Sequence, residues 1–337
     1  MRLLIFRFSA MGDVALTVPA LRAVLDPYAE IEATLVTRPL FAPFFNDIPR
    51  LTLHTPDLRR YGGVAGLRRL FRELQATGDY DAVIDLHDVL RTKVLRLFFR
   101  AAGVPVHVID KGRKEKRALI KGRVTGPLKH TVERYLDVFR AAGLTQQPTT
   151  PPYIQVTATP KDSAAGDPPL GIAPLARHTL KSWPEEKMQD LLRLLRERYP
   201  AARIYLFGGP EERPALERLA AAAGDAAQLT LVLPLAEQLA LMQQMRVFIS
   251  MDSSNMHLAA LLGVPVVSVW GATHPWAGFS PWGGDEQGMV QIPREELPCR
   301  PCTVYGKGSC RRKDLACLNR ITPERVAEKV EEVMRDE

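Results

Sequence analysis

Short apolar runs alternate with amphipathic stretches along the first half of the chain. The apolar runs have the length of strands and cover residues 3–8, 33–36, 82–86 and 106–109. Apolar side chains recur with helical spacing over residues 14–25, 64–76, 91–101 and 132–142. Buried strands that alternate with helices are typical of βαβ units, so this half predicts a parallel sheet covered by helices.

The second half repeats the pattern. It has strand-like runs at residues 170–173, 203–207, 247–251 and 266–270, and helix-like stretches at 184–199, 211–223, 235–245, 255–262 and 323–335. Residues 146–169 are rich in proline and predict a linker between the halves, with one apolar stretch at 153–156.

Together these patterns predict an α/β protein with two doubly wound parallel-sheet domains, each of the Rossmann-like kind. We expect the domains to span residues 1–150 and 168–320, followed by a C-terminal helix within 321–337. Ligands of open parallel sheets bind beyond the carboxyl ends of the strands, so the two domains are expected to face a shared cleft.

The chain carries a net charge of +7, which is unevenly distributed. Residues 1–165 hold 25 Lys and Arg against 16 Asp and Glu, whereas the remainder holds 20 against 22. The densest basic run is Lys111-Gly-Arg-Lys-Glu-Lys-Arg117. A solvated, mobile loop is the simpler interpretation of this run. The alternative is a surface for a phosphorylated lipid, an acidic sugar or nucleic acid, although the lack of interleaved aromatic residues argues against nucleic acid.

The sequence also bears on location. No apolar run reaches the ~18 residues needed to span a bilayer. The N-terminal apolar run ends at Arg7 and is followed by Asp13, which is a poor secretory signal. We therefore expect a cytoplasmic protein.

The first strand-to-helix junction carries Gly12 and Asp13. Glycine permits a tight turn or a close approach of the backbone to a ligand. Aspartate at a helix start is a good N-cap, and taken alone this pair is best interpreted as a cap. The junction does not match Gly-x-Gly-x-x-Gly, so it is not expected to bind a dinucleotide.

Two junctions of the second half suit a nucleotide. Lys181 precedes a predicted helix, where backbone N–H groups and an ammonium group can hold phosphate, or it is simply exposed. Gly208 and Gly209 end a strand and let a ligand approach the backbone. Glu211 or Glu212 can bond ribose or base groups, or simply favour a helix start.

A third junction follows the strand at residues 247–251. It combines small polar side chains with a helix start, which suits a phosphate or a ligand rich in hydroxyl groups. The candidate donor-binding residues here are Asp252, Ser253, Ser254, Asn255 and His257.

All four cysteines lie close together in the sequence, at Cys299, Cys302, Cys310 and Cys317. Such a set can bind a structural metal ion or serve as thiols that tighten a loop. The spacing lacks the second Cys-x-x-Cys of a zinc ribbon, and persistent disulfides are disfavoured in a reducing cytoplasm.

With these residues considered together, the chain resembles the ADP-heptose:lipopolysaccharide heptosyltransferases of glycosyltransferase family 9. The resemblance covers nearly the whole chain and rests first on five segments: residues 3–22, Lys181-Ser-Trp-Pro, Phe207-Gly-Gly-Pro, residues 252–267 and Trp270-Gly-Ala-Thr-His-Pro275. Cys299-Arg-Pro-Cys302, with Cys310 and Cys317, also resembles members of the second-heptosyltransferase kind. The family has the GT-B architecture, with the acceptor on the N-terminal side and the nucleotide-sugar on the C-terminal side.

The resemblance implies an inverting transfer of heptose from ADP-heptose to the inner core of lipopolysaccharide, without a cofactor or a catalytic metal. Asp13 is then the general base and Lys181 holds the diphosphate. The glycines, glutamates and the Asp252 junction described above bind the donor. Gly12, Lys111, Arg113 and Lys114 are expected to bind the acceptor. We also expect peripheral association with the inner membrane and no binding of nucleic acid.

The chain departs from the family at Ser254, where members usually have glycine. Serine there tolerates a positive φ poorly and adds bulk beside the ligand. The departure bears on which donor sugar is used. Two other functions stay open. One is a GT-B enzyme that uses another nucleotide-sugar, as a transferase, epimerase or hydrolase. The other is a basic protein that binds lipid or nucleic acid and has an inactive cleft.

Overall fold

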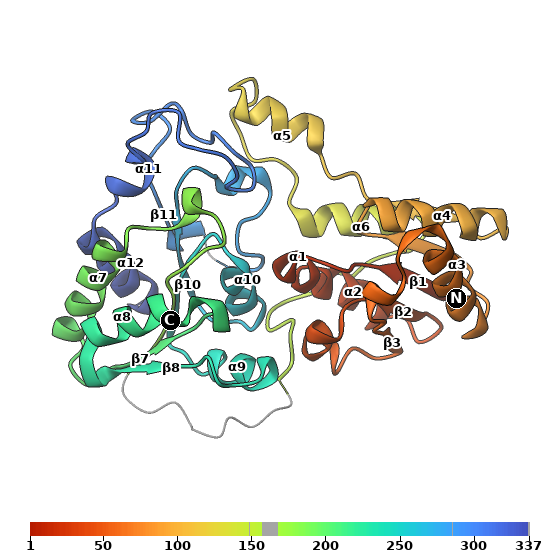
Figure 1. Cartoon of the computed structure of the whole chain (residues 1–337), viewed down its shortest axis with the longest axis horizontal. Helices are drawn as coiled ribbons and strands as arrows, with labels where there is room; N and C mark the ends of the chain where they lie inside the picture. The colour runs from red at the N-terminus through yellow and green to blue at the C-terminus, as the bar shows by residue number, and fades with distance from the viewer. Residues whose placement is uncertain (148, 157–167, 285, 336–337) are drawn as a thin grey trace. The chain divides into compact units, whose positions relative to one another are not determined.

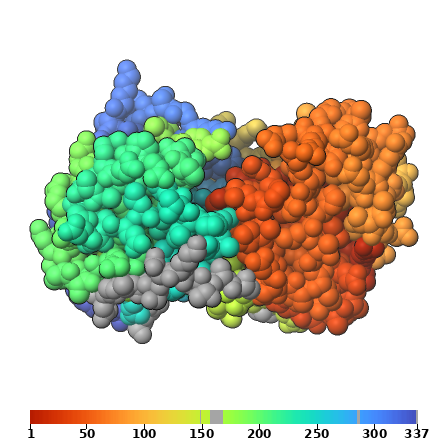
Figure 2. Space-filling model, turned by 60° about the horizontal axis from the view of Figure 1, so that its bottom comes forward, coloured from red at the N-terminus to blue at the C-terminus, as the bar shows by residue number. Residues whose placement is uncertain are grey.

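The computed structural model describes residues 1–147, 149–156, 168–284 and 286–335, which form two compact units (Figure 1). Unit 1 comprises Met1–Lys111 and His130–Gln155, and unit 2 comprises Gly112–Lys129 and Val156–Glu337. Figure 2 shows the surface of unit 1 mainly in red and orange and that of unit 2 chiefly in green. Half of the predicted linker, residues 146–169, lies outside the described residues.

Unit 1 contains a five-stranded sheet in the order β3-β2-β1-β4-β5, and every strand pair is parallel. The strands are β1 (Arg2–Phe6), β2 (Glu32–Val36), β3 (Leu51–His54), β4 (Ala82–Asp85) and β5 (Val106–Val108). The helices are α1 (Met11–Ala15), α2 (Thr17–Leu25), α3 (Gly63–Ala76), α4 (Leu90–Ala101) and α6 (Thr131–Ala141). Helices α3 and α4 bury Leu70, Leu74 and Phe99 against Leu4 and Phe6 of β1.

Unit 2 contains a six-stranded parallel sheet in the order β11-β10-β9-β6-β7-β8. The strands are β6 (Pro169–Ala173), β7 (Arg203–Leu206), β8 (Ala227–Leu229), β9 (Val247–Met251), β10 (Val266–Trp270) and β11 (Met289–Gln291). The helices are α5 (Arg113–Ile120), α7 (Glu185–Arg198), α8 (Arg213–Ala223), α9 (Leu235–Met242), α10 (Ser254–Leu261), α11 (Ala316–Asn319) and α12 (Pro323–Arg335). The predicted α/β fold with two parallel sheets is confirmed.

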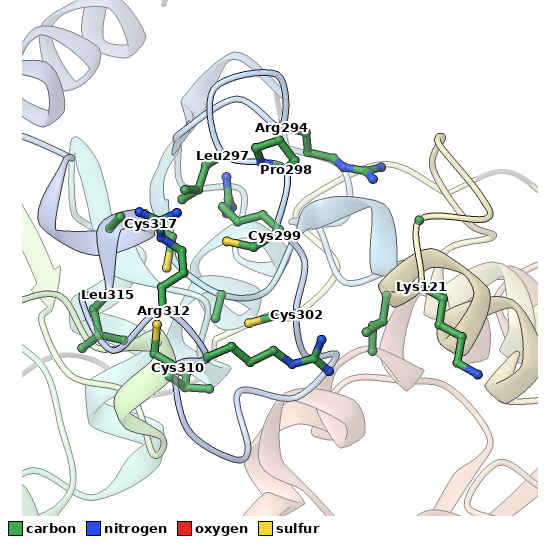
Figure 3. Close-up of a pocket in the computed structure, with 17 residues that line it drawn as sticks. Lys121, Arg294, Leu297, Pro298, Cys299, Cys302, Cys310, Arg312, Leu315 and Cys317 are labelled. Carbon is green, nitrogen blue, oxygen red and sulfur yellow. The ribbon is translucent and has the colours of Figure 1, made fainter.

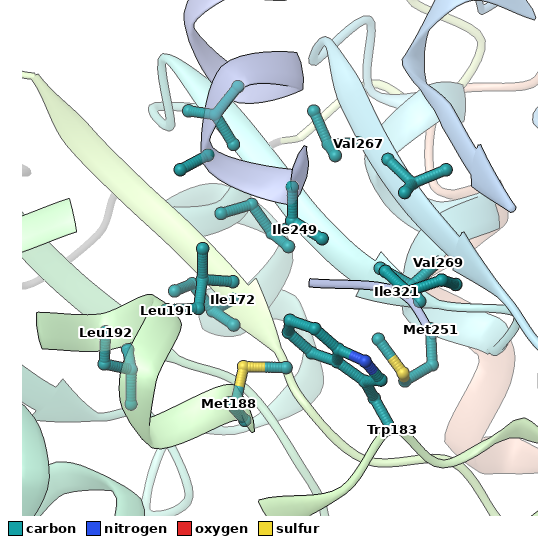
Figure 4. Packing of buried hydrophobic residues seen from close by; sticks show 14 of the residues in the cluster. Ile172, Trp183, Met188, Leu191, Leu192, Ile249, Met251, Val267, Val269 and Ile321 are labelled. Atoms are coloured by element: carbon teal, nitrogen blue, oxygen red, sulfur yellow. The ribbon is translucent and has the colours of Figure 1, made fainter. Parts of the chain in front are cut away.

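The core of unit 2 is built by alternate residues of its central strands. Ile249 and Met251 of β9 pack with Trp183 (Figure 4). Phe248, next to Ile249 in the strand, points to the opposite face and contacts Phe207. This alternation follows from the two-residue period of a strand. Buried Trp183 donates from Nε1 to the carbonyl oxygen of Leu318 at 3.2 Å. The indole is therefore both packed and hydrogen-bonded, as a buried tryptophan requires.

Several elements depart from the sequence prediction. The basic run expected as a mobile loop instead forms α5, because Leu119 packs with Ala277 and Val304 while Arg113 and Lys114 are exposed. Helix α1 begins at Met11, earlier than predicted, so that Asp13 lies in its first turn. The short strands β3, β8 and β11 were not predicted, because three or four residues, mostly half-buried, give little hydrophobic signal.

The strand order of each sheet reverses once. In unit 1 the chain builds outward from β1 through β2 and then from β4 to β5, so the reversal lies between β1 and β4. In unit 2 it lies between β6 and β9. At such a switch point the connections leave on opposite sides and open a crevice at the carboxyl ends of the strands. None of the described helices has both the length and the apolar character needed to cross a membrane.

Candidate functional site

The switch point of unit 1 holds Asp13. Its carboxylate Oδ2 lies 2.7 Å from Nη2 of Arg7, which directly follows β1, and its side chain is 34% exposed. The same oxygen accepts a hydrogen bond from the backbone N–H of Ala10 at 3.4 Å, so Asp13 also caps the start of α1. Asp13 is therefore not the N-cap residue expected from sequence, which is Ala10; it is the third residue of α1, and its carboxylate reaches back to the N-cap while staying accessible.

Arg7 is buried and held on several sides. It donates from Nη1 to the carbonyl oxygen of Leu86 at 2.6 Å, and its guanidinium lies 5.6 Å from the ring centroid of Tyr135. Burial works to lower the pKa of Arg7, but Tyr135 and the Asp13 carboxylate together raise it. Tyr135 in turn donates its hydroxyl to the backbone oxygen of Asp13 at 3.0 Å. The position of the Asp13 carboxylate is thus fixed from both its side chain and its backbone.

His87 stands beside this pair, just after β4. Its Nδ1 accepts from the backbone N–H of Phe8 at 3.4 Å, which leaves the proton on Nε2, 3.4 Å from Oγ of Ser9. Burial, Arg7 and Lys111 lower the pKa of His87 to about 3. A neutral imidazole therefore lies next to Asp13 at every physiological pH.

Replacing His87 by Gln is expected to flatten the pH dependence of stability. An unfolded histidine takes up a proton below about pH 6.5, whereas folded His87 does not until about pH 3. The wild-type free energy of unfolding should therefore fall as the pH drops from 6.5 towards 3, by up to about 1.4 kcal/mol per pH unit from this residue. Urea unfolding at pH 7 and pH 5 measures how steeply the free energy of unfolding changes with pH. An identical slope in His87→Gln would contradict the buried, neutral histidine.

The residues predicted for acceptor binding are not all brought together within unit 1. Gly12 is buried in α1, and Lys111 donates from Nζ to the carbonyl oxygen of Asp88 at 3.3 Å. Arg113 and Lys114 belong to α5, which groups with unit 2, and both are exposed on that helix.

The switch point of unit 2 holds the second cluster. Nζ of Lys181, eight residues after β6, lies 2.8 Å from Oδ2 of Asp252, which directly follows β9. Thr273, from the turn after β10, donates its hydroxyl to the same oxygen at 2.7 Å. Asp252 is 5% exposed, so this carboxylate requires both partners. Three adjacent strands thus fix one ammonium group at the carboxyl edge of the sheet.

The other predicted donor residues flank this cluster. Gly208 and Gly209 follow β7, and the carboxylate of Glu212 accepts the backbone N–H of Gly209 at 2.7 Å. Glu212 is thus engaged as a cap of its own turn, whereas Glu211 is exposed. Oγ of Ser253 lies 3.1 Å from Oγ of Ser250.

Ser254 is the first residue of α10, and its backbone is helical. No positive φ is needed at this position, so the serine that replaces the family's usual glycine adds bulk without backbone strain. Asn255 is half-buried in the first turn of the same helix, and His257, two residues further on, is buried.

The four cysteines line one pocket of about 230 Å³ in unit 2 (Figure 3). All four are free thiols, and Arg294, Arg311 and Arg312 also line the pocket. Burial raises the pKa of Cys317 to about 11. Across residues 1–147, 149–156, 168–284 and 286–335, no group of three or more His, Cys, Asp or Glu side chains is arranged to hold a metal ion. The metal interpretation of the cysteines gains no support from this geometry.

Arg300 anchors the cysteine-rich segment, which comprises residues 299–317. It is 1% exposed, and its guanidinium donates to the carbonyl oxygens of Gly271 (2.6 Å), Thr273 (3.0 Å) and Trp270 (3.3 Å). Further acceptors are the carbonyl of Ile292 and Oε1 of Gln291. Burial among these neutral oxygens lowers the pKa of Arg300 to about 10. Arg300 thereby holds the backbone of the turn that carries Thr273.

Arg300→Met is expected to lower the free energy of unfolding by about 3–5 kcal/mol, because several buried carbonyl groups lose their donor. Calorimetric unfolding checks this. The control is Arg311→Met in the same segment, where the side chain is exposed and the expected change is within about 0.5 kcal/mol. Equal midpoints for the two variants would show that the buried guanidinium does not stabilise unit 2.

Comparison with known proteins agrees with this geometry. Residues 67–307 match the family described as glycosyltransferase family 9 (heptosyltransferase), which is well over half of the chain. The chain belongs to glycosyltransferase family 9. The lipopolysaccharide heptosyltransferase 1 of Pseudomonas aeruginosa is 28% identical to this family 9 enzyme. The alignment is 360 positions long and covers 99% of this chain and 98% of the relative. The lipopolysaccharide heptosyltransferase 1 of Escherichia coli is 29% identical over 315 residues, covering 88% and 95%.

Solved structures show the same fold. The E. coli heptosyltransferase WaaC with ADP-2-deoxy-2-fluoro heptose matches with a TM-score of 0.71 and 24% identity, over 98% of this chain and 99% of that chain. The two parallel-sheet α/β units of the family 9 enzyme are therefore of the GT-B class, as predicted.

Sequence reasoning missed four residues of the two clusters: Arg7, His87, Tyr135 and Thr273. Arg7 gave a usable signal, since it is a charge at the end of an otherwise apolar strand. His87 and Thr273 also follow predicted strands, where polar residues reach the ligand edge of a parallel sheet. Tyr135 gave none, because its position in the helical pattern is that of an ordinary core residue.

Proposed function

We propose that this family 9 enzyme transfers heptose from ADP-heptose to a sugar of the inner core of lipopolysaccharide. The observation that carries the proposal is the ammonium group of Lys181, held at the switch point of unit 2 by Asp252 at 2.8 Å. A fixed cation at the carboxyl edge of a parallel sheet suits a nucleoside diphosphate. The two relatives named above are heptosyltransferases, and this chain matches each of them over nearly its full length.

In the proposed reaction the acceptor hydroxyl attacks the anomeric carbon of the donor sugar, and the bond from that carbon to the diphosphate breaks. Asp13 takes the proton of the hydroxyl, and the electron pair of the broken bond leaves with ADP. Lys181 stabilises the negative charge that grows on the diphosphate. Because one displacement occurs, the configuration of the anomeric carbon is inverted.

The remaining roles follow from the positions of the side chains. Gly208, Gly209 and Glu211 are proposed to contact the adenosine, with Glu212 shaping that turn. Ser253, Ser254, Asn255 and His257 are proposed to contact the phosphates and the sugar. The transfer is proposed to need no metal ion, because Lys181 supplies the positive charge that a divalent ion would otherwise bring.

Gly12, Lys111, Arg113 and Lys114 are proposed to bind the acceptor. The exposed Arg113 and Lys114 on α5 suit the phosphates and acidic sugars of such an acceptor. We propose that the enzyme works in the cytoplasm and binds peripherally to the inner membrane, where its lipid-linked acceptor lies. No nucleic acid partner is proposed.

Incubation of the purified protein with ADP-heptose and heptose-deficient lipopolysaccharide tests the proposal. We expect release of ADP and a mass increase of one heptose, unchanged by a chelator. Stabilisation by UDP-sugars alone in a thermal-shift assay would instead favour a GT-B enzyme with another donor. Salt-sensitive binding of nucleic acid without nucleotide-sugar binding would favour the basic binding protein.

A further inference from the structure

The cysteine-rich segment lies against Lys181 as well as around its own pocket. Gly306 of this segment is buried and has a φ of +76°. A Cβ atom at Gly306 would lie 2.7 Å from Cγ of Lys181, 3.0 Å from Cδ and 3.1 Å from Cε. The alkyl stem of Lys181 therefore runs along the backbone of Gly306 with no room for a methyl group between them.

The segment is tied to the same turn that completes the Lys181 cluster. The backbone N–H of Cys302 donates to the carbonyl of Ala272 at 3.0 Å, and Ala272 donates to the carbonyl of Leu180 at 3.1 Å. Arg300 holds the carbonyl of Thr273 at 3.0 Å. These bonds anchor the segment at Arg300 and Cys302 and anchor the backbone next to Lys181 at Leu180, so an added atom at Gly306 is expected to displace the lysine side chain.

We propose that Gly306 is a positioning residue for the transfer reaction, and that the cysteine-rich segment serves to clamp the stem of Lys181. The clamp keeps the ammonium group on Asp252 and aimed at the donor diphosphate. This inference rests on the function proposed above. The contact begins at Cγ, close to the backbone, so Lys181 cannot avoid an added methyl group by moving only its tip. A methyl group at Gly306 displaces the whole stem and takes Nζ away from Asp252.

The chain supplies a matched control for this proposal. Gly308 lies two residues further on, is exposed, and has a φ of +101°, but a Cβ atom there would meet nothing within 4 Å. Both Gly306→Ala and Gly308→Ala strain a left-handed backbone position. Only the first places an atom against Lys181, so the difference between them isolates the clamp.

The test is calorimetric titration of ADP into the wild type and the two variants. Gly306→Ala is expected to weaken ADP binding about tenfold, the size of losing one charge-assisted contact, and Gly308→Ala is expected to stay within about twofold. In a Lys181→Ala background, Gly306→Ala should cause less than about a twofold further change, since the stem it displaces is gone. A simple loss of loop structure would persist in that background.

Each result decides the matter. Equal ADP affinities in Gly306→Ala and Gly308→Ala, or an undiminished effect of Gly306→Ala without Lys181, would overturn the clamp. Should Gly306→Ala fail to fold, unfolding is compared against Lys181→Ala: adding Gly306→Ala to Lys181→Ala is expected to lower the unfolding midpoint no more than Gly308→Ala lowers that of the wild type, and a larger drop would overturn the clamp as well. Failure of the wild type to bind ADP would reject the proposed function itself, which is a distinct outcome.

Discussion

Asp13→Asn is expected to lower kcat of heptosyl transfer by about 10²–10⁴-fold, the range lost when a general base is removed. Asparagine keeps the shape of the side chain and can still accept from the backbone N–H of Ala10, but it cannot take a proton from the acceptor hydroxyl. ADP binding should be unchanged, because the residues proposed for the donor lie in unit 2. Transfer rates and ADP titrations on the purified variant check both parts.

The control for this variant is Asp26→Asn. Asp26 also pairs with a largely buried arginine, Arg22, at 3.5 Å, and its side chain is 39% exposed, close to the 34% of Asp13. It lies at the end of α2, away from the carboxyl edge of the sheet. Asp26→Asn should keep nearly full activity. A folded Asp13→Asn protein as active as this control would remove Asp13 from the chemistry.

Lys181→Met is expected to weaken ADP binding by about 10–100-fold, because a charged hydrogen-bond partner contributes about 1.5–3 kcal/mol. A further fall in kcat of about 10²–10³-fold is expected, since the leaving diphosphate gains charge in the transition state. Methionine retains most of the stem against Gly306, so the variant isolates the ammonium group. Titration and steady-state kinetics separate the two effects.

The matched control is Lys187→Met, a half-buried lysine in the first turn of α7. Its effect on ADP affinity and kcat should be within experimental error. Loss of stability in Lys181→Met also has a clear cause, since buried Asp252 loses the ammonium group and keeps the hydroxyl of Thr273. Unchanged ADP affinity in Lys181→Met would mean that the diphosphate binds elsewhere.

The sequence predicted the central strands of both sheets because these strands are buried and nearly free of charge. β9 and β10 have the predicted limits, residues 247–251 and 266–270, since every residue in them is buried. α5 escaped prediction as an ordered element because charged side chains outnumber the apolar ones that anchor it. Elements that pack on only one narrow face give the weakest periodic signal.

The residues of the candidate site could be predicted from the sequence in part, whereas the contacts between them could not. Asp13, Lys181 and Asp252 could be singled out because each stands at a strand-to-helix junction visible in the chain. The contact of Lys181 with Asp252 could not be predicted, because it depends on β6 lying next to β9 in the sheet. The approach of Gly306 to Lys181 was still less visible, since it joins residues far apart through an irregular segment.

The central claim is that the carboxylate of Asp13 removes the proton from the hydroxyl that attacks a sugar held by the diphosphate cluster of Lys181. A crystal structure with a non-transferable ADP-heptose analogue and an acceptor fragment tests it most directly. The account predicts the acceptor hydroxyl within about 2.6–3.2 Å of the Asp13 carboxylate and the diphosphate on Nζ of Lys181. An acceptor hydroxyl bound to another base, or a diphosphate bound away from Lys181, would contradict it.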